Sequence, residues 1–231
     1  MGGQACVLYG AAQFSKDIDF VLLANDDNRQ RLELALSELQ AERIAVPRLS
    51  LEVLERGHAV HFRCQALGVE GLRVDVMARL RGLPDFETLW NRRTTLEDPS
   101  GITYEVLSVA DLVTAKKTQR EKDWPMITAL VESHYHNERN APTREKISFW
   151  LRECRIAERL VELARQFPVE TSEEQENRPL LMLAPSGTLE DLRTALDAEV
   201  RSEQSRDREY WDPLKRELEQ IRFEEKRRRD N

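Results

Sequence analysis

The chain has 231 residues, of which 40% are hydrophobic and 33% are charged, and its formal net charge is −7. This composition is typical of a globular protein with one large domain or two small ones, and the negative charge excludes recruitment of nucleic acid by bulk electrostatics, except through a local basic patch. The sequence has no apolar run near the ~20 residues that cross a bilayer and no secretory leader pattern, so we expect a cytoplasmic protein without membrane contact.

The first half of the chain alternates short apolar segments with helical patterns, which predicts an α+β fold. A helix is expected over about residues 4–12, a strand over 17–24, and a helix over 27–43 with Asp26 or Asp27 as its N-cap. Two alternating segments, 58–64 and 72–80, are separated by glycines and predict a hairpin. A second hairpin is expected around residues 98–101, because the sequence DPSG suits a type I turn.

After residue 107 the hydrophobic spacing becomes helical. Ser108 with Asp111, and Thr188 with Asp191, have the spacing of helix-capping pairs. We expect one helix over 143–166, a polar linker over 169–187, two further helices and a frayed C-terminal tail. The predicted domains are therefore residues 1–107, with a twisted mixed sheet flanked by helices, and residues 108–231, which are helical. Cys6, Cys64 and Cys154 lack paired spacing and are expected to be reduced core residues.

Two aspartates interrupt the apolar segment DIDFVLLA at residues 17–24. Asp17 and Asp19 are two apart, so on a strand they project from one face with Cα atoms roughly 6.6 Å apart. Such close carboxylates repel each other, and hard divalent ions such as Mg²⁺ neutralise them well. The alternative is a solvated strand face. Asp75, between two valines in another predicted strand, favours the metal interpretation because it can face the same site.

Two glycines precede these acids. Gly2 and Gly3 would let backbone N–H groups approach a phosphate closely at the start of the following helix. The chain then supplies paired acids on one strand and a third acid on another. In-line nucleotidyl transfer needs these parts, with two metal ions about 3.5–4 Å apart that clamp the attacking and leaving oxygens.

Residues 2–19 resemble the signature of the DNA polymerase beta-like nucleotidyltransferase superfamily. The similarity is greatest to minimal nucleotidyltransferases and to the AbiEii-like abortive-infection toxin nucleotidyltransferases. The positions that match this pattern without a gap are Gly2, Gly3, Ala5, Gly10, Ser15, Asp17, Ile18 and Asp19. Residues 106–124 are also similar to a family helix that carries a lysine followed by Arg-x-Lys-Asp.

This resemblance implies a nucleotidyltransferase fold and Mg²⁺-dependent transfer of a nucleoside monophosphate from an NTP to a hydroxyl of a protein, a tRNA or a small molecule. Asp17 and Asp19 would hold two Mg²⁺ ions, and Asp75 would be a ligand or the base. The remaining residues implied in nucleotide binding are Gly2, Gly3, Ser15, Lys116 and Arg120, with Asp123 beside them. In a toxin-like setting, a cognate antitoxin would be a partner.

The sequence also departs from the family pattern. Tyr9 stands where histidine is common, and Gln13 stands where arginine is common. The helix and strand that usually precede the glycines are missing, so the first strand is expected to be truncated. These departures leave open a catalytically degenerate protein that binds a nucleotide or a partner without turnover. A further alternative is that the helical half is an interaction module and the first half its scaffold.

Overall fold

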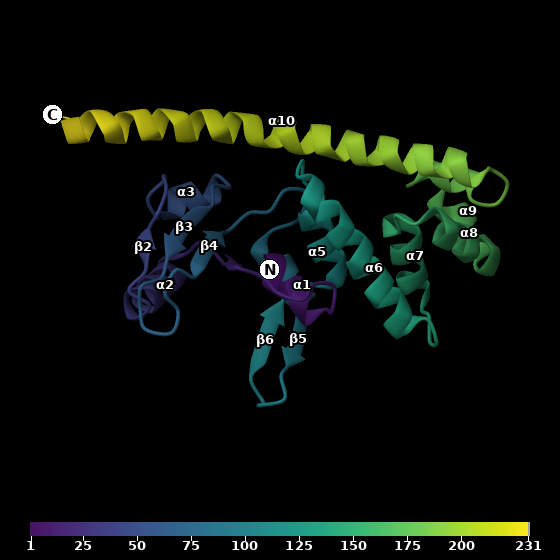
Figure 1. Ribbon diagram of the computed structural model, residues 1–231, viewed down its shortest axis with the longest axis horizontal. Coiled ribbons are helices and arrows are strands. Elements are labelled where there is room, and N and C mark those ends of the chain that lie inside the picture. The colour runs from purple at the N-terminus through teal and green to yellow at the C-terminus, as the bar shows by residue number, and fades with distance from the viewer. Residues whose placement is uncertain (231) are drawn as a thin grey trace. The chain divides into compact units, whose positions relative to one another are not determined.

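A computed structural model describes residues 1–230 as a mixed α+β protein, with 57% helix and 11% strand (Figure 1). The chain divides into two compact units. The first comprises residues 1–8, 12–115 and the chain from residue 208 onward, and the second comprises residues 9–11 and 116–207. Among the described residues, no helix combines the length and the apolar character needed to cross a membrane. The predicted domain boundary at 107/108 stays a prediction.

The first unit contains a small mixed sheet. Its strands are β1 (Asp17–Val21), β2 (Glu42–Arg43), β3 (Val60–Arg63) and β4 (Arg73–Met77), in the order β1-β4-β3-β2. β1 runs parallel to β4, while β3 is antiparallel to both β4 and β2. The predicted hairpin of residues 58–80 is therefore confirmed as β3 and β4, and β1 lies at an edge of the sheet.

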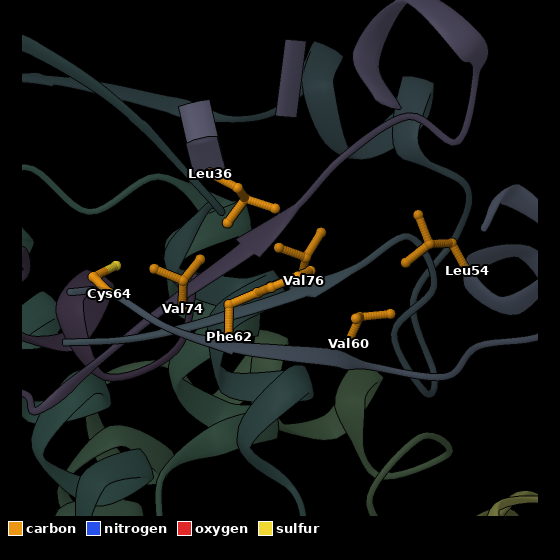
Figure 2. Close-up of a cluster of buried hydrophobic side chains, with 7 residues drawn as sticks. All are labelled: Leu36, Leu54, Val60, Phe62, Cys64, Val74 and Val76. Carbon is orange, nitrogen blue, oxygen red and sulfur yellow. The ribbon is translucent and has the colours of Figure 1, made fainter. Parts of the chain in front are cut away.

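One face of this sheet forms a hydrophobic core. It packs with α2 (Asp26–Glu38) and α3 (Leu51–Glu55), and Figure 2 shows the buried side chains, which are Leu36, Leu54, Val60, Phe62, Cys64, Val74 and Val76. Because side chains alternate along a strand, burying residues 60, 62, 74 and 76 on this face directs residues 61, 73 and 75 to the other. The alternating sequence thus separates an apolar face from a polar one.

The helix α2 begins and ends differently from the sequence prediction. Asn25, not Asp26 or Asp27, is the N-cap, and its side chain accepts a hydrogen bond from the backbone N–H of Asn28 at 2.8 Å. The helix ends at Glu38, and Gln40 has a positive φ of 49°. The expected extension to residue 43 is wrong because residues 42–43 pair with β3 as strand β2.

Several short elements complete the first unit. They are α1 (Gly2–Leu8), α4 (Phe86–Asn91), β5 (Thr94–Glu97), β6 (Thr103–Val106) and α5 (Val109–Lys116), whose last residue belongs to the second unit. β5 and β6 form the second predicted hairpin. The N–H of Gly101 donates to the carbonyl of Asp98 at 2.9 Å, which is the i to i+3 bond expected of the DPSG turn. The Ser108–Asp111 capping pair is also confirmed.

The second unit is helical. Its elements are a short 3-10 helix η1 (Glu121–Asp123), α6 (Trp124–Glu138), α7 (Arg144–Glu153), α8 (Ala157–Gln166), α9 (Pro168–Glu174), a 3-10 helix η2 (Pro179–Leu183) and the first half of α10. The single helix predicted over 143–166 is wrong because Cys154 adopts an extended conformation and separates α7 from α8. The linker predicted over 169–187 is wrong too, since α9 and η2 occupy much of it.

The last helix, α10 (Leu189–Asp230), is continuous where two helices and a frayed tail were expected. Thr188 and Asp191 cap its start as predicted. Its second half belongs to the first unit, where Glu225 binds the guanidinium of Arg43 through two bonds of 3.2 Å. Glu217 also contacts the imidazole of the buried His58 at 2.9 Å. Polar contacts therefore join the C-terminal segment to the β2–β3 region.

The core of the first unit predicts a large stability effect at Phe62, which is 6% exposed. We expect Phe62→Ala to lower the free energy of unfolding by about 3–5 kcal/mol, because it removes a buried ring and leaves a cavity. Leu67→Ala is the control, since Leu67 is 96% exposed, and its effect should stay within about 0.5 kcal/mol. Urea denaturation followed by circular dichroism measures both. Similar urea midpoints for Phe62→Ala and Leu67→Ala would contradict the burial of Phe62 in this core.

Candidate acidic site on the polar face of the sheet

Three predicted acids lie on the polar face of the sheet. In the parallel pairing of β1 with β4, Asp19 is the register partner of Asp75, and Asp17 is the register partner of Arg73. Register partners in adjacent strands project from the same face. Asp17 and Asp19 share that face with Asp75 because they are two residues apart. The structure therefore brings all three carboxylates to the side opposite the hydrophobic core.

Asp75 has two close partners. Its side chain is 10% exposed, and its Oδ1 lies 2.8 Å from His61 Nδ1 and 2.8 Å from Arg73 Nε. His61 is the register partner of Asp75 in β3, and Arg73 is two residues earlier in β4, so both share its face. Both hydrogen bonds end on one oxygen of this carboxylate, Oδ1.

His61 Nδ1 carries one proton, so it can donate a hydrogen bond to only one of its two neighbours. Arg73 Nη2 lies 3.1 Å from the same nitrogen, but a guanidinium can only donate. The carboxylate of Asp75 is the stronger acceptor and the shorter contact, so we assign the N–H of His61 as a donor to Asp75. Arg73 Nη2 is then a close neighbour of the imidazole rather than its hydrogen-bond donor.

These contacts shift two pKa values. Burial by itself raises the pKa of Asp75, but hydrogen bonds from His61 and Arg73 outweigh it, so the pKa lies below its usual value. The hydrogen bond to Asp75 raises the pKa of Arg73, and the charges of Asp17 and Asp19 act in the same direction. The guanidinium of Arg73 therefore interacts electrostatically with all three carboxylates.

Both predicted phosphate-loop glycines lie against site residues. Gly2 has a φ of 72°, and a Cβ atom there would be 1.8 Å from Asp19 Oδ2. A Cβ atom at Gly3 would be 2.3 Å from Ser15 Oγ. Since real Cβ atoms do not approach so closely, these positions accept only glycine without a shift of the neighbours. A role in phosphate binding stays a prediction.

Ser15 and Met1 hold the backbone of strand β1. The hydroxyl of Ser15 donates to the carbonyl of Asp17 at 3.0 Å, just where the strand begins. The N-terminal ammonium of Met1 donates to the carbonyl of Asp19 at 2.8 Å. Ser15, which the sequence placed among nucleotide-binding residues, thus has an observed structural contact.

Lys116 and Arg120 belong to the second unit. Lys116 is buried, with its Nζ 3.6 Å from Asp123 Oδ1, and Arg120 Nε lies 2.8 Å from Asp123 Oδ2. Thr118 Oγ1 also bonds Asp123 at 2.5 Å. In this structure both cations therefore bind the same carboxylate, and their predicted contact with a triphosphate stays a prediction.

His61 and Arg73 were missed as site residues from the sequence. The pairing of His61 with Asp75 depends on the β3–β4 register, which the sequence does not specify. Arg73 carried a simpler signal. It stands two residues before Asp75 in an alternating strand, so it had to share the face of that acid.

The donor atoms on this face suit Mg²⁺ chemically, because hard cations prefer carboxylate oxygens. Asp17 and Asp19 supply two such groups from one strand, and the backbone of Gly2 leaves room for the carboxylate of Asp19. Within residues 1–230, no three His, Cys, Asp or Glu side chains are arranged as a complete metal site. Neither a scan of protein-family models nor a search of curated proteins finds a match to this chain.

The steric requirement for glycine at position 2 can be tested with the variant Gly2→Ala. The added methyl group would collide with the carboxylate of Asp19. The alanine would also have to adopt the left-handed backbone conformation of Gly2, which is unfavourable for a residue with a Cβ atom. Gly68→Ala is the matched control, because Gly68 has a φ of 87° and no described atom within 4 Å of the Cβ position. We expect the control to lose about 1–2 kcal/mol from backbone strain, and Gly2→Ala to lose more. Thermal unfolding measures the difference, and equal losses would contradict the contact.

The pKa of Asp75 gives a pH prediction. Because the folded pKa lies below the unfolded value of about 3.9, ionised Asp75 adds stability above that pH, which is lost as the pH falls through the folded pKa. The variant Arg73→Gln lacks the hydrogen bond from the guanidinium that offsets the effect of burial, so the pKa of Asp75 should rise. NMR titration of its side-chain carboxyl carbon measures this shift. An unchanged or lower pKa in the variant would contradict the Arg73 contact.

Proposed function

We propose that this chain has a nucleotidyltransferase fold and transfers a nucleoside monophosphate from an NTP to a hydroxyl acceptor with the help of Mg²⁺. The single observation that supports this proposal most is the placement of Asp17, Asp19 and Asp75 on one face of two adjacent parallel strands. Carboxylates grouped in this way repel each other unless a cation neutralises them. The glycine that abuts Asp19 adds support, because it makes this crowded arrangement possible.

In this proposal the acceptor oxygen attacks the α-phosphorus of the NTP. A new phosphorus–oxygen bond forms, the bond to the β-phosphate oxygen breaks, and pyrophosphate leaves while the acceptor gives up its proton. Bound Mg²⁺ supplies charge neutralisation for the phosphates. Asp17 and Asp19 would hold the metal, Asp75 would be a further metal ligand or the base that takes the proton of the acceptor hydroxyl, and Gly2 and Gly3 would approach the phosphates. Catalysis rests on positioning and electrostatics.

The acceptor is proposed only as a class. A protein side chain, a tRNA end and a small molecule each present the required hydroxyl. Lys116 and Arg120 are proposed to meet the triphosphate, and in this structure both contact Asp123. A cytoplasmic, toxin-like role with a cognate antitoxin belongs to the same proposal and follows from the sequence resemblance alone.

A degenerate protein that binds a nucleotide or a partner without turnover is the second candidate. One observation favours it. Oδ1 of Asp75 accepts bonds from both His61 and Arg73, so this carboxylate is partly engaged before any substrate arrives. The absence of arginine at position 13, where the sequence has Gln13, points the same way. The two candidates differ in metal-dependent turnover, which experiment can measure directly.

The test uses Asp19→Asn and each of the four labelled NTPs with Mg²⁺ and cell extract. We expect wild-type protein to transfer label to an acceptor and to bind NTP more tightly with Mg²⁺. The variant should lose that tightening and lower transfer by roughly 100-fold or more, because charge neutralisation is the main catalytic effect. Asp27→Asn is the control, since Asp27 is an exposed carboxylate in the first turn of α2. Label on gels and Kd values with and without Mg²⁺ are the measurements.

The possible results separate the candidates. If wild type and Asp19→Asn bind NTP equally, with or without Mg²⁺, and no label is transferred, the enzyme proposal is wrong. NTP binding without transfer supports the degenerate candidate. Transfer that survives in Asp19→Asn would show that catalysis does not depend on this acidic face.

A further inference from the structure

Two hollows lie in the first unit, between the last turns of α10 and the segment that begins with β2. The larger hollow, of about 410 Å³, is lined from residues 47–53 and from α10. The smaller hollow, of about 250 Å³, is lined from residues 43–46 and from α10. Glu225 lines both, and its carboxylate binds Arg43 through two bonds of 3.2 Å and Arg48 at 3.4 Å. The two hollows are therefore neighbours on one surface.

This surface is positively charged, although the chain as a whole has a net charge of −7. Two carboxylates line the hollows, those of Glu224 and Glu225. The cationic side chains that line them are Arg43, Arg48, Arg222, Lys226 and Arg228. Five cations against two carboxylates leave a formal charge of +3 on the lining. A local excess of this kind attracts anions even where the whole molecule is acidic.

Three of these cations are available to a ligand. Arg222, Lys226 and Arg228 are exposed on α10. Among the side chains that the structure describes, no carboxylate pairs with any of the three. An anion can therefore contact them without breaking an ion pair. Arg43 differs, because Glu225 holds its guanidinium in place beside the smaller hollow.

The available cations are spread along the helix. Arg222 and Lys226 are four residues apart, so they share one side of α10 and lie about 6 Å apart along its axis. Arg228 lies about 3 Å farther on. A ligand with a single anionic group can meet only part of this row. A strand with a phosphate at every residue can meet several cations at once, and the counterions that it releases favour binding.

The larger hollow adds an apolar surface to this charge. Pro47, Val53 and Ile221 line it, and Glu224 lies at the same hollow. The flat face of a nucleobase can pack on apolar side chains, and a carboxylate can accept a hydrogen bond from the amino group of a base. Inorganic polyphosphate has no group that would use this hollow. The combination of cations and apolar lining therefore favours a nucleic-acid strand.

We propose that these two hollows form a binding site for a single-stranded nucleic acid. Its phosphates contact Arg222, Lys226 and Arg43, and one base occupies the larger hollow. RNA and DNA share this chemistry. The site is the local basic patch that a chain of negative net charge needs in order to bind a nucleic acid. The inference does not rest on the proposed function, because it uses neither the acidic face nor a metal.

The experiment measures fluorescence anisotropy of a short labelled oligouridylate and of the matching oligothymidylate with the full chain, at about 50 to 200 mM KCl. We expect a Kd on the order of 1–100 µM for wild type, which is typical of binding dominated by phosphate contacts. The double variant Arg222→Gln with Lys226→Gln should bind roughly tenfold more weakly. Its slope of log K against log salt should fall by about 1.4, since each phosphate contact on a single strand contributes about 0.7.

The matched control is Lys215→Gln with Arg216→Gln. These two cations are also exposed on α10 but line neither hollow, so binding should stay within about twofold of wild type. Competition with unlabelled polyphosphate and poly-glutamate of matched charge tests the ligand class, and both should compete more weakly than the oligonucleotides. Circular dichroism of each variant checks that the helix is intact.

Three results would overturn the proposal. They are no binding by wild type at about 100 µM protein, equal losses in the two double variants, and a polyphosphate or poly-glutamate that competes as well as the oligonucleotides. Tighter binding of one oligonucleotide supports the proposal and identifies RNA or DNA as the ligand. Asp19→Asn should bind both oligonucleotides like wild type, so this inference and the proposed function can fail independently.

Discussion

The pairing of β1 with β4 is the interaction on which the acidic face depends. It sets Asp19 opposite Asp75 in adjacent parallel strands. A slip of one residue would turn the acids toward the hydrophobic core and the valines toward solvent. Burial of Val74 and Val76 against α2 and α3 makes such a slip costly, so the apolar face fixes where the polar face places its charges.

The same constraint explains the crowding around Asp19. A strand at the edge of a sheet is held from one side by its neighbour, and here the backbone of Gly2 in α1 also lies against the side chain of Asp19. Any larger residue at that position would displace the carboxylate. The acidic face therefore needs glycine at position 2 as much as it needs the aspartates. This need is steric and does not depend on a bound ligand.

Much of the sheet could be predicted from the sequence because its strands alternate cleanly. The segment around Asp75 and the hairpin that contains it were predicted correctly, since valine at every second position marks one buried face. Two of the wrong predictions lie where the chain direction changes without a glycine or proline signal. Cys154 ends α7 through its backbone conformation alone, and Arg43 pairs as a strand although its spacing fits a helix.

The candidate site was predictable only within single segments. The spacing of Asp17 and Asp19 is local, so their shared face followed from the sequence. The contacts of His61 and Arg73 with Asp75 depend on strand register and side-chain reach, which composition and periodicity do not specify. Lys116 likewise looked like an available cation, but its burial beside Asp123 depends on tertiary packing.

The contact between Arg43 and Glu225 has a consequence for how the protein is made. These residues are separated by 182 positions, yet they lie in one compact unit. A ribosome delivers the chain in order, so the sheet region leaves the exit tunnel long before its carboxylate partner exists. Until translation has passed that point, the guanidinium of Arg43 lacks its carboxylate partner. The native contacts of this unit can therefore be completed only after residue 225 has been synthesised.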